Sequence, residues 1–120
     1  MPLPIKKREM ARGDDWTLGL TVKRAGAVVD ITDAVFWLTA KKNLTDSDAD
    51  ALIQVTPGDI IDAPNGKAEI TIPSAATSDH EKFPATGITL HYDIQIRTAA
   101  GKKHTLERGR LTVLPDVTFA

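Results

Sequence analysis

The sequence predicts an all-β protein, an antiparallel β-sandwich built from seven or more short strands, with a barrel as the second choice. The β-branched residues Thr, Ile and Val make up 31 of the 120 residues, and these side chains favour pleated sheets. Apolar and polar residues alternate with a period of two in several short stretches, which is the pattern of strands with one buried face. Turn residues separate these stretches, whereas no long stretch keeps a helical period.

The strands are expected in chain order wherever this alternation occurs. The clearest case is residues 90–97, where a polar residue stands at every second position and the apolar face should belong to the core. Residues 52–56 read as a further strand. The positions expected to point inward are Trp16, Leu18, Leu20, Val22, Ala34, Phe36, Leu38, Ala40, Ala68, Ile70, Ile72, Leu90, Tyr92, Ile94, Ile96, Leu111 and Val113.

Turns are predicted at residues 24–26, 64–66 and 99–101. Asn65-Gly66 is the strongest hairpin signal, because Asn and Gly tolerate the positive φ of tight turns. Gly109 stands where a bulge would bend the last strand. Residues 46–51 and 74–80 carry helix-capping side chains, and the second of these could form a single capped turn.

Composition indicates one globular unit. The chain has 13.0 kDa, a formal charge of −1 and no cysteine, which excludes disulfides, thiolate metal sites and a thiol nucleophile. Residues 1–10 are expected to be an extension or an edge strand, and residues 11–120 a single β-sandwich domain. No signal peptide or membrane span is readable, so we expect synthesis in the cytoplasm and no membrane partner. The balanced charge argues against a nucleic-acid partner.

Candidate chemistry is sparse, and we expect neither an enzyme nor a cofactor. His80, His91 and His104 lack the spacing of metal ligands, although His91 and His104 could be cross-strand neighbours. Asp46, Asp48 and Asp50 resemble the start of a calcium loop, but Ala51 and Pro57 stand where the EF-hand needs Gly and Glu. No metal site and no catalytic residue is therefore predicted.

Charge is spread unevenly, and this suggests contact surfaces. Residues 6–12 and 97–110 are basic, whereas residues 46–62 are acidic. Either these are solvated surfaces, or opposite patches meet between copies. We expect contacts at exposed sheet edges, namely residues 5–10 and the last strand at residues 111–114. The basic segment would either lie along its own domain or reach the acidic stretch of a neighbouring copy. The possible interaction surface comprises Lys6, Lys7, Arg8, Trp37, Asp46, Asp48 and Asp50.

Five motifs carry a resemblance to a known family. They are Arg12–Leu18, Val29–Ala34, Asp62–Ala68, Tyr92–Ile96 and Gly109–Val113. This succession, over residues 11–114, resembles the immunoglobulin-like domain at the N-terminus of phage baseplate upper proteins and related small tail proteins of phages and prophages. One departure is Asp33, which stands where the family usually has glycine.

The resemblance implies an immunoglobulin-like sandwich of about seven to nine strands and a non-catalytic structural or assembly protein of the virion. Its partners would be other virion proteins or copies of itself, with a homo-oligomer possible. The alternative is an adhesin-like or carbohydrate-binding module, for which Trp37 is the outward aromatic candidate.

Overall fold

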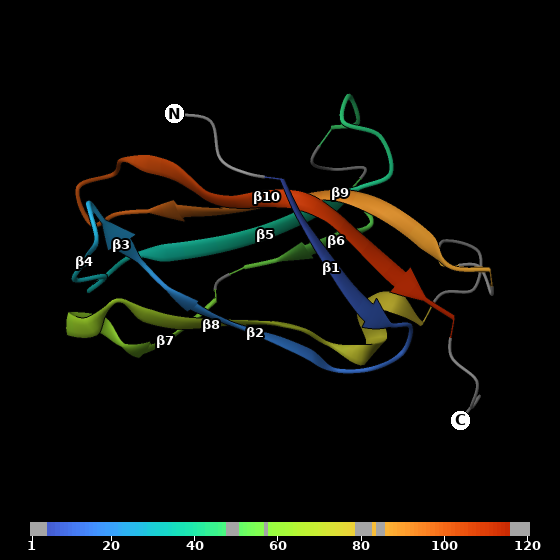
Figure 1. Cartoon of the computed structure of the whole chain (residues 1–120), viewed down its shortest axis with the longest axis horizontal. Coiled ribbons are helices and arrows are strands. Elements are labelled where there is room, and N and C mark those ends of the chain that lie inside the picture. The colour runs from blue at the N-terminus through green and yellow to red at the C-terminus, as the bar shows by residue number, and fades with distance from the viewer. Residues whose placement is uncertain (1–4, 48–50, 57, 79–82, 84–85, 116–120) are drawn as a thin grey trace.

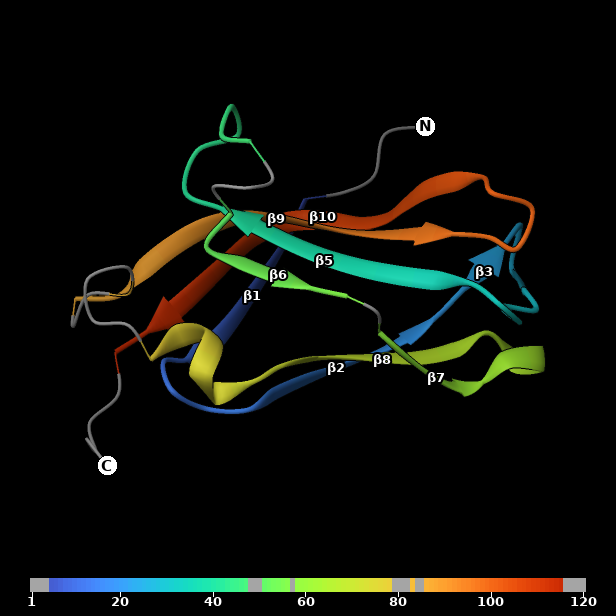
Figure 2. The same cartoon turned by 180° about the vertical axis from the view of Figure 1, so that it is seen from behind.

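Eight of the ten strands form two facing layers in the computed structural model, which describes residues 5–47, 51–56, 58–78, 83 and 86–115 (Figures 1 and 2). The predicted all-β sandwich is confirmed. Its eight longer strands lie within the expected number, and the other two have two residues each. The strands are β1 (Ile5–Ala11), β2 (Trp16–Thr21), β3 (Lys23–Arg24), β4 (Ala27–Val28), β5 (Val35–Lys41), β6 (Ile53–Val55), β7 (Asp59–Asp62), β8 (Lys67–Ile72), β9 (Ile88–Arg97) and β10 (Lys103–Leu114).

One sheet has five strands in the order β1-β10-β9-β5-β6, and the other has three in the order β2-β8-β7. β3 and β4 form a small ribbon at one end. All pairings are antiparallel except that of β1 with β10, so the five-stranded sheet is mixed. Parallel pairing is possible there because β1 and β10 lie at opposite ends of the sequence, and no hairpin dictates their direction.

The core lies between the sheets and follows the predicted alternation. Leu90, Tyr92, Ile94 and Ile96 are all at most 5% exposed, which confirms the apolar face of β9 as core. Phe83, in the segment between β8 and β9, is also buried. The other buried apolar residues are Met10, Leu18, Val22, Ile31, Phe36, Leu38, Ala40, Ile53, Ala68, Ile70, Ile72, Leu111 and Val113.

The three predicted turns are confirmed. Ala25 and Gly26 have φ of 52° and 82° and connect β3 to β4, and Gly101 has a φ of 83° between β9 and β10. Gly66 has a φ of 69° and follows a short 3₁₀ turn, Ala63–Asn65, that connects β7 to β8. A Cβ at Gly66 would come within 2.7 Å of two backbone oxygens, so this position needs glycine for space as well as for φ.

Asp33 also has a positive φ, of 62°. The sequence resemblance expects glycine at this position, and the left-handed backbone gives the physical reason. Asp is one of the few other residues that adopts this conformation readily.

The predictions for the last strand need two corrections. The bulge in β10 lies between Thr105 and Glu107 rather than at Gly109. Gly109 instead lets β1 approach, because a Cβ there would overlap the backbone of Lys6. The prediction that residues 111–114 form an open edge is wrong, since β1 pairs with β10 over that whole stretch.

Helical structure within the described residues is limited to short turns. Ser74–Thr77 forms a single 3₁₀ turn, as expected for residues 74–80, although its N-cap is Pro73 without a side-chain bond. Much of residues 46–51 lies outside the described residues. No helix in the described part of the chain is long and apolar enough to cross a membrane.

Candidate docking surfaces

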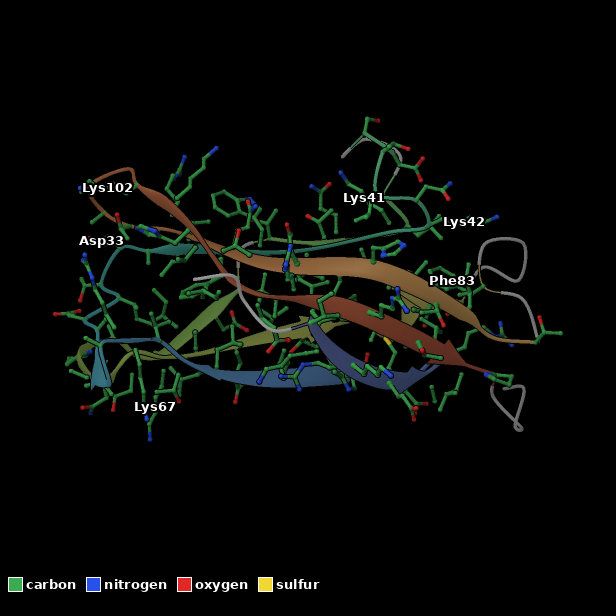
Figure 3. All side chains as sticks on the ribbon, turned by 45° about the horizontal axis from the view of Figure 1, so that its top comes forward. Asp33, Lys41, Lys42, Lys67, Phe83 and Lys102 are labelled. Atoms are coloured by element: carbon green, nitrogen blue, oxygen red, sulfur yellow. The ribbon has the colours of Figure 1, made fainter. Side chains whose placement is uncertain are left out.

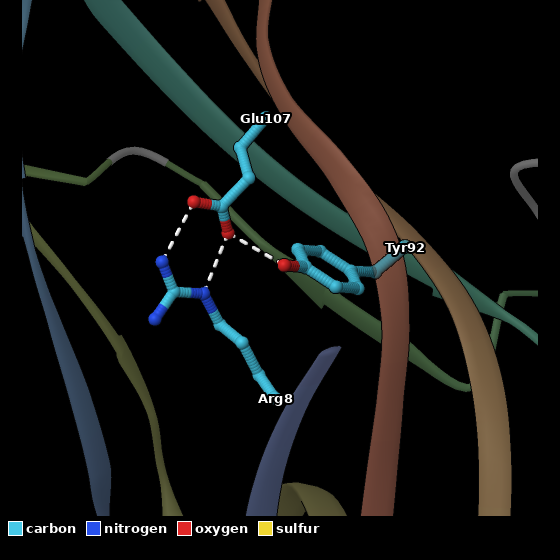
Figure 4. Close-up of polar contacts among 3 residues, drawn as sticks. All are labelled: Arg8, Tyr92 and Glu107. Atoms are coloured by element: carbon cyan, nitrogen blue, oxygen red, sulfur yellow. Dashed lines mark hydrogen bonds and ion pairs between the residues drawn. The ribbon is translucent and has the colours of Figure 1, made fainter. Parts of the chain in front are cut away.

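A buried polar network holds β1 against the rest of the five-stranded sheet (Figure 4). Arg8 on β1 donates two hydrogen bonds to Glu107 on β10, of 2.6 Å from Nε and 2.7 Å from one terminal nitrogen. Tyr92 on β9 donates its hydroxyl to the same carboxylate at 2.5 Å. Because Glu107 is only 8% exposed, these donors replace the water that the charge loses on burial.

The pKa values of all three groups reflect this arrangement. Burial alone would raise the pKa of Glu107, but the bonds from Arg8 and Tyr92 outweigh it and leave the pKa below its usual range. Burial, together with the bond to Glu107, raises the pKa of Tyr92. The bond to Glu107 raises the pKa of the Arg8 guanidinium. At neutral pH the network therefore consists of an ion pair and a neutral phenol, which suits a contact that holds β1 in place.

The basic segment on β1 lies along its own domain. Of the two alternatives that the sequence leaves open, the edge position is the observed one, and it takes Arg8 into the network with Glu107. Strand alternation separates the neighbouring lysines. Lys7 points outward beside Arg110, whereas Lys6 lies with Arg8 on a groove between the two sheets.

The outward face of the five-stranded sheet is basic over four adjacent strands. Figure 3 labels one of its cations, Lys41, which ends β5 and lies near Lys42. The strand register places Lys7, Arg110, His91 and Lys41 in one row across β1, β10, β9 and β5. The carboxylates on the described part of this face are Glu9 and Asp93. Its cations are Lys7, Lys41, Arg97, Lys103, Arg108 and Arg110.

Two shallow depressions of about 280 and 200 Å³ lie on this outward face and share Thr39 and Gln95. The larger one runs beneath Leu44, an apolar side chain that is 74% exposed in the loop after β5. Trp37 lines the smaller one together with Lys103. This face thus offers apolar side chains, amides and cations next to one another.

Trp37 is half-buried on this face, as its alternation predicts. The Arg97 guanidinium carbon lies 5.6 Å from the centre of its ring. This cation–π contact uses one face of the indole, so a sugar ring that stacked there would have to displace Arg97. The geometry therefore favours Trp37 as part of a basic surface over Trp37 as a sugar platform.

The opposite side of the sandwich has a different surface. Apart from Ile61, at the irregularity in β7, the outward positions of the three-stranded sheet are small or polar, and Thr17 and Thr71 are hydrogen-bonded across it at 2.9 Å. Its charged residues are Asp59, Asp62, Lys67 and Glu69. The two broad faces of the molecule therefore differ in charge, which the near-zero total conceals.

The acidic residues of the predicted surface are placed only in part. Asp46 lies in the loop after β5, where its carboxylate accepts the backbone N–H of Asn43 at 3.1 Å. Asp48 and Asp50 lie outside the described residues. The structure brings Trp37 close to Arg97 and Lys103, but not to the basic residues of β1, which lie at the far edge of the same sheet.

His91 and His104 do not lie opposite each other in the sheet. His91 pairs with Arg110 and His104 pairs with Ile96, so the expectation that they are cross-strand neighbours is wrong. His80 lies outside the described residues. Among the residues that the structure describes, no three His, Asp or Glu side chains come together in a way that could hold a metal ion.

Sequence reasoning missed Glu107 and Tyr92 as partners of Arg8. The strand pattern predicts Tyr92 in the core, and a buried phenol needs a polar partner. The pattern therefore indicates that a polar group lies near Tyr92, but it does not say which one. No pattern in the sequence indicates that Glu107 is buried, because the bulge between Thr105 and Glu107 shifts the alternation and turns this carboxylate inward.

Comparison with known proteins finds similarity among solved structures. No family model and no curated protein sequence matches the chain. Among solved structures, it is similar to the N-terminal domain of phage TP901-1 ORF48, with 9% sequence identity and a TM-score of 0.45. The match covers 97% of this chain and 90% of that one. The assignment to phage baseplate upper proteins remains a prediction.

Proposed function

We propose that this protein is a non-catalytic structural or assembly component of a phage tail or baseplate, and that it works by docking to other virion proteins. The observation that carries this proposal is the basic outward face of the five-stranded sheet, six cations against two carboxylates on the described strands. A face of one sign with Trp37 and Leu44 among its cations fits an acidic partner segment with an apolar anchor.

The internal chemistry supports the same role. Arg8, Tyr92 and Glu107 all have shifted pKa values, and Arg8 and Tyr92 are both hydrogen-bonded to Glu107. Shifted pKa values often mark catalytic groups, but here they accompany a contact that fastens an edge strand. The motif succession of residues 12–113 supports the place in a phage particle.

The proposal is tested on particles from a phage or lysogen that encodes this chain. Deleting the gene should give particles with missing or incomplete tails in electron micrographs, and a plasmid copy should restore them. Particles purified on a density gradient should contain the protein. Complete, infectious particles from the deletion strain would refute the virion role.

Two matched variants test the docking face in the same complementation assay. The double variant Arg108→Glu, Arg110→Glu reverses two outward charges and should leave the protein folded but absent from particles. Lys67→Glu, an exposed reversal on the opposite face, should be incorporated normally. Equal incorporation of both would remove the basic face from the mechanism. Salt-dependent retention of double-stranded DNA fragments by the wild type alone would assign that face to nucleic acid instead.

A further inference from the structure

The sandwich has two long open sides, and each is formed by consecutive strands at the edges of the two sheets. β1 and β2 form one side, which faces the viewer in Figure 1, and β6 and β7 form the other, which faces the viewer in Figure 2. An edge strand presents unpaired backbone groups on which another strand can pair. The surface properties of the two sides are therefore decisive for self-association.

The β1–β2 side carries a groove of about 350 Å³ between the free edge of β2 and the other sheet. Leu20, Val22 and Leu106 supply its apolar lining. Lys6, Arg8 and Lys23 supply its positive charge, of which Arg8 is already paired with Glu107. Two lysines thus remain to attract an incoming strand of opposite charge.

The β6–β7 side presents such a strand. β7 reads Asp59-Ile60-Ile61-Asp62, and its two isoleucines are 38% and 57% exposed. Edge strands are usually protected by charge and seldom expose adjacent large apolar side chains. Here the apolar pair lies between two carboxylates, which complements a groove that combines apolar side chains with two lysines.

The register across the three-stranded sheet shows how the two sides would meet. Gly19 and Asp59 pair with the same residue of β8, and so do Leu20 and Ile60. Because β2 and β7 are both antiparallel to β8, they run in the same direction. A neighbouring copy that is displaced sideways and keeps its orientation therefore brings its β7 alongside β2, with Ile60 next to Leu20.

Pairing of β7 with β7 of another copy is disfavoured. An antiparallel pair centred on the two isoleucines would place Asp59 opposite Asp62 in both directions, and like charges directly opposite each other destabilise a sheet. The charges thus favour a contact between two different sides over a symmetric one. Such contacts repeat from copy to copy and give a ring or a filament.

We propose that β7 of one copy adds to the free edge of β2 in the next, with Ile60 directed into the groove. Asp59 and Asp62 then point to the outer face of the three-stranded sheet beside the groove, where their negative charges are attracted by Lys6 and Lys23 without direct ion pairs. The partner at this site is a second copy of this chain. The contact uses none of the basic outward face. The proposed self-association can therefore be tested independently of the proposed docking to other virion proteins.

The test combines two charge-reversal variants with sedimentation velocity over a range of concentrations. Variant one is Asp59→Lys, Asp62→Lys, and variant two is Lys6→Glu, Lys23→Glu. Wild type should associate more at ~50 mM than at ~500 mM salt, because screening weakens the charge pairing. Each variant alone should associate roughly tenfold or more weakly, since its β7 and its groove now carry the same sign.

An equimolar mixture of the two variants should recover association, because each β7 then meets a groove of opposite sign. Recovery also shows that both variants are folded. Arg108→Glu, an exposed reversal on the outward face, should associate like wild type. A monomeric wild type at low salt, a mixture that fails to recover, or a loss confined to the β7 variant would each overturn the proposal. The last result would indicate symmetric pairing of β7.

Discussion

Replacing Arg8 with Met should destabilise the fold strongly, although Arg8 lies on an edge strand. Met keeps most of the length of the side chain and removes the charge and both hydrogen bonds to Glu107. The carboxylate would then be buried with the Tyr92 hydroxyl as its remaining donor within the network. The matched control is Lys7→Met, which removes the same charge one residue along β1 from an exposed position.

The magnitude follows from the burial of the pair. Removing one member of a fully buried ion pair costs about 3–5 kcal/mol. The Arg8 side chain is 27% exposed, so water can partly solvate the remaining carboxylate, and we expect ~2–3 kcal/mol here. For a domain of this size that corresponds to a fall in the melting temperature of roughly 8–12 °C. The Lys7 control should change stability by less than ~0.5 kcal/mol.

The pH dependence separates a lost ion pair from lost packing. In the native protein the pKa of Glu107 lies below its usual value, so its ionised form stabilises the fold. This contribution is present above the unfolded pKa of about 4.3 and is lost as the pH falls through the lower native pKa. Without Arg8, burial is opposed by fewer groups and raises the native pKa of Glu107, so the stabilisation by the ionised form decreases.

The assay is urea unfolding of wild type, Arg8→Met and Lys7→Met at several values between pH 4 and pH 7. The stability gap between wild type and Arg8→Met should widen as the pH rises through this range, whereas the gap to Lys7→Met should stay flat. Equal losses of stability for the two variants, or a gap for Arg8→Met that does not change with pH, would show that the Arg8–Glu107 contact does not stabilise the fold as proposed.

Three further predictions concern the backbone and the core. Gly109→Ala should detach β1 and cost ~2 kcal/mol or more in urea unfolding, because the added Cβ overlaps the backbone of Lys6; an unchanged midpoint would contradict this. Ala25→Asn should raise stability by about 0.5–1 kcal/mol, because Ala25 has a φ of 52° in a tight turn that Asn-Gly favours. Ile94→Asp should unfold the domain, whereas Gln95→Asp on the outward face should change the melting temperature little; similar losses for both would exclude the assigned faces.

The core and the turns could be predicted from the sequence because both depend on local chemistry. Period-two alternation identified the inward face of β9, and turn residues located the hairpins. The pairing of β1 could not be predicted in this way. Its partner β10 lies about a hundred positions away, and a parallel pair leaves no turn between its strands to mark it.

The basic outward face could not be predicted from the sequence for the same reason. Charge runs along the sequence indicated basic and acidic stretches, but alternation sends neighbouring residues to opposite faces. Lys6 and Lys7 therefore belong to two different surfaces, and Lys41 joins one of them through strand pairing. Only the register of four strands assembles a basic face, and no linear pattern encodes it.

The position of β1 also explains why self-association should involve one pair of edges and not another. By pairing with β10, β1 closes the edge that the longest strand would otherwise expose, and Arg8 fastens it through Glu107. The new edge presents lysines, which protect it from non-specific pairing. On the other side, β7 exposes Ile60 and Ile61 with only flanking carboxylates as protection. Those carboxylates oppose self-pairing of β7 but attract a lysine-lined groove, so the same residues that prevent aggregation would also select the partner.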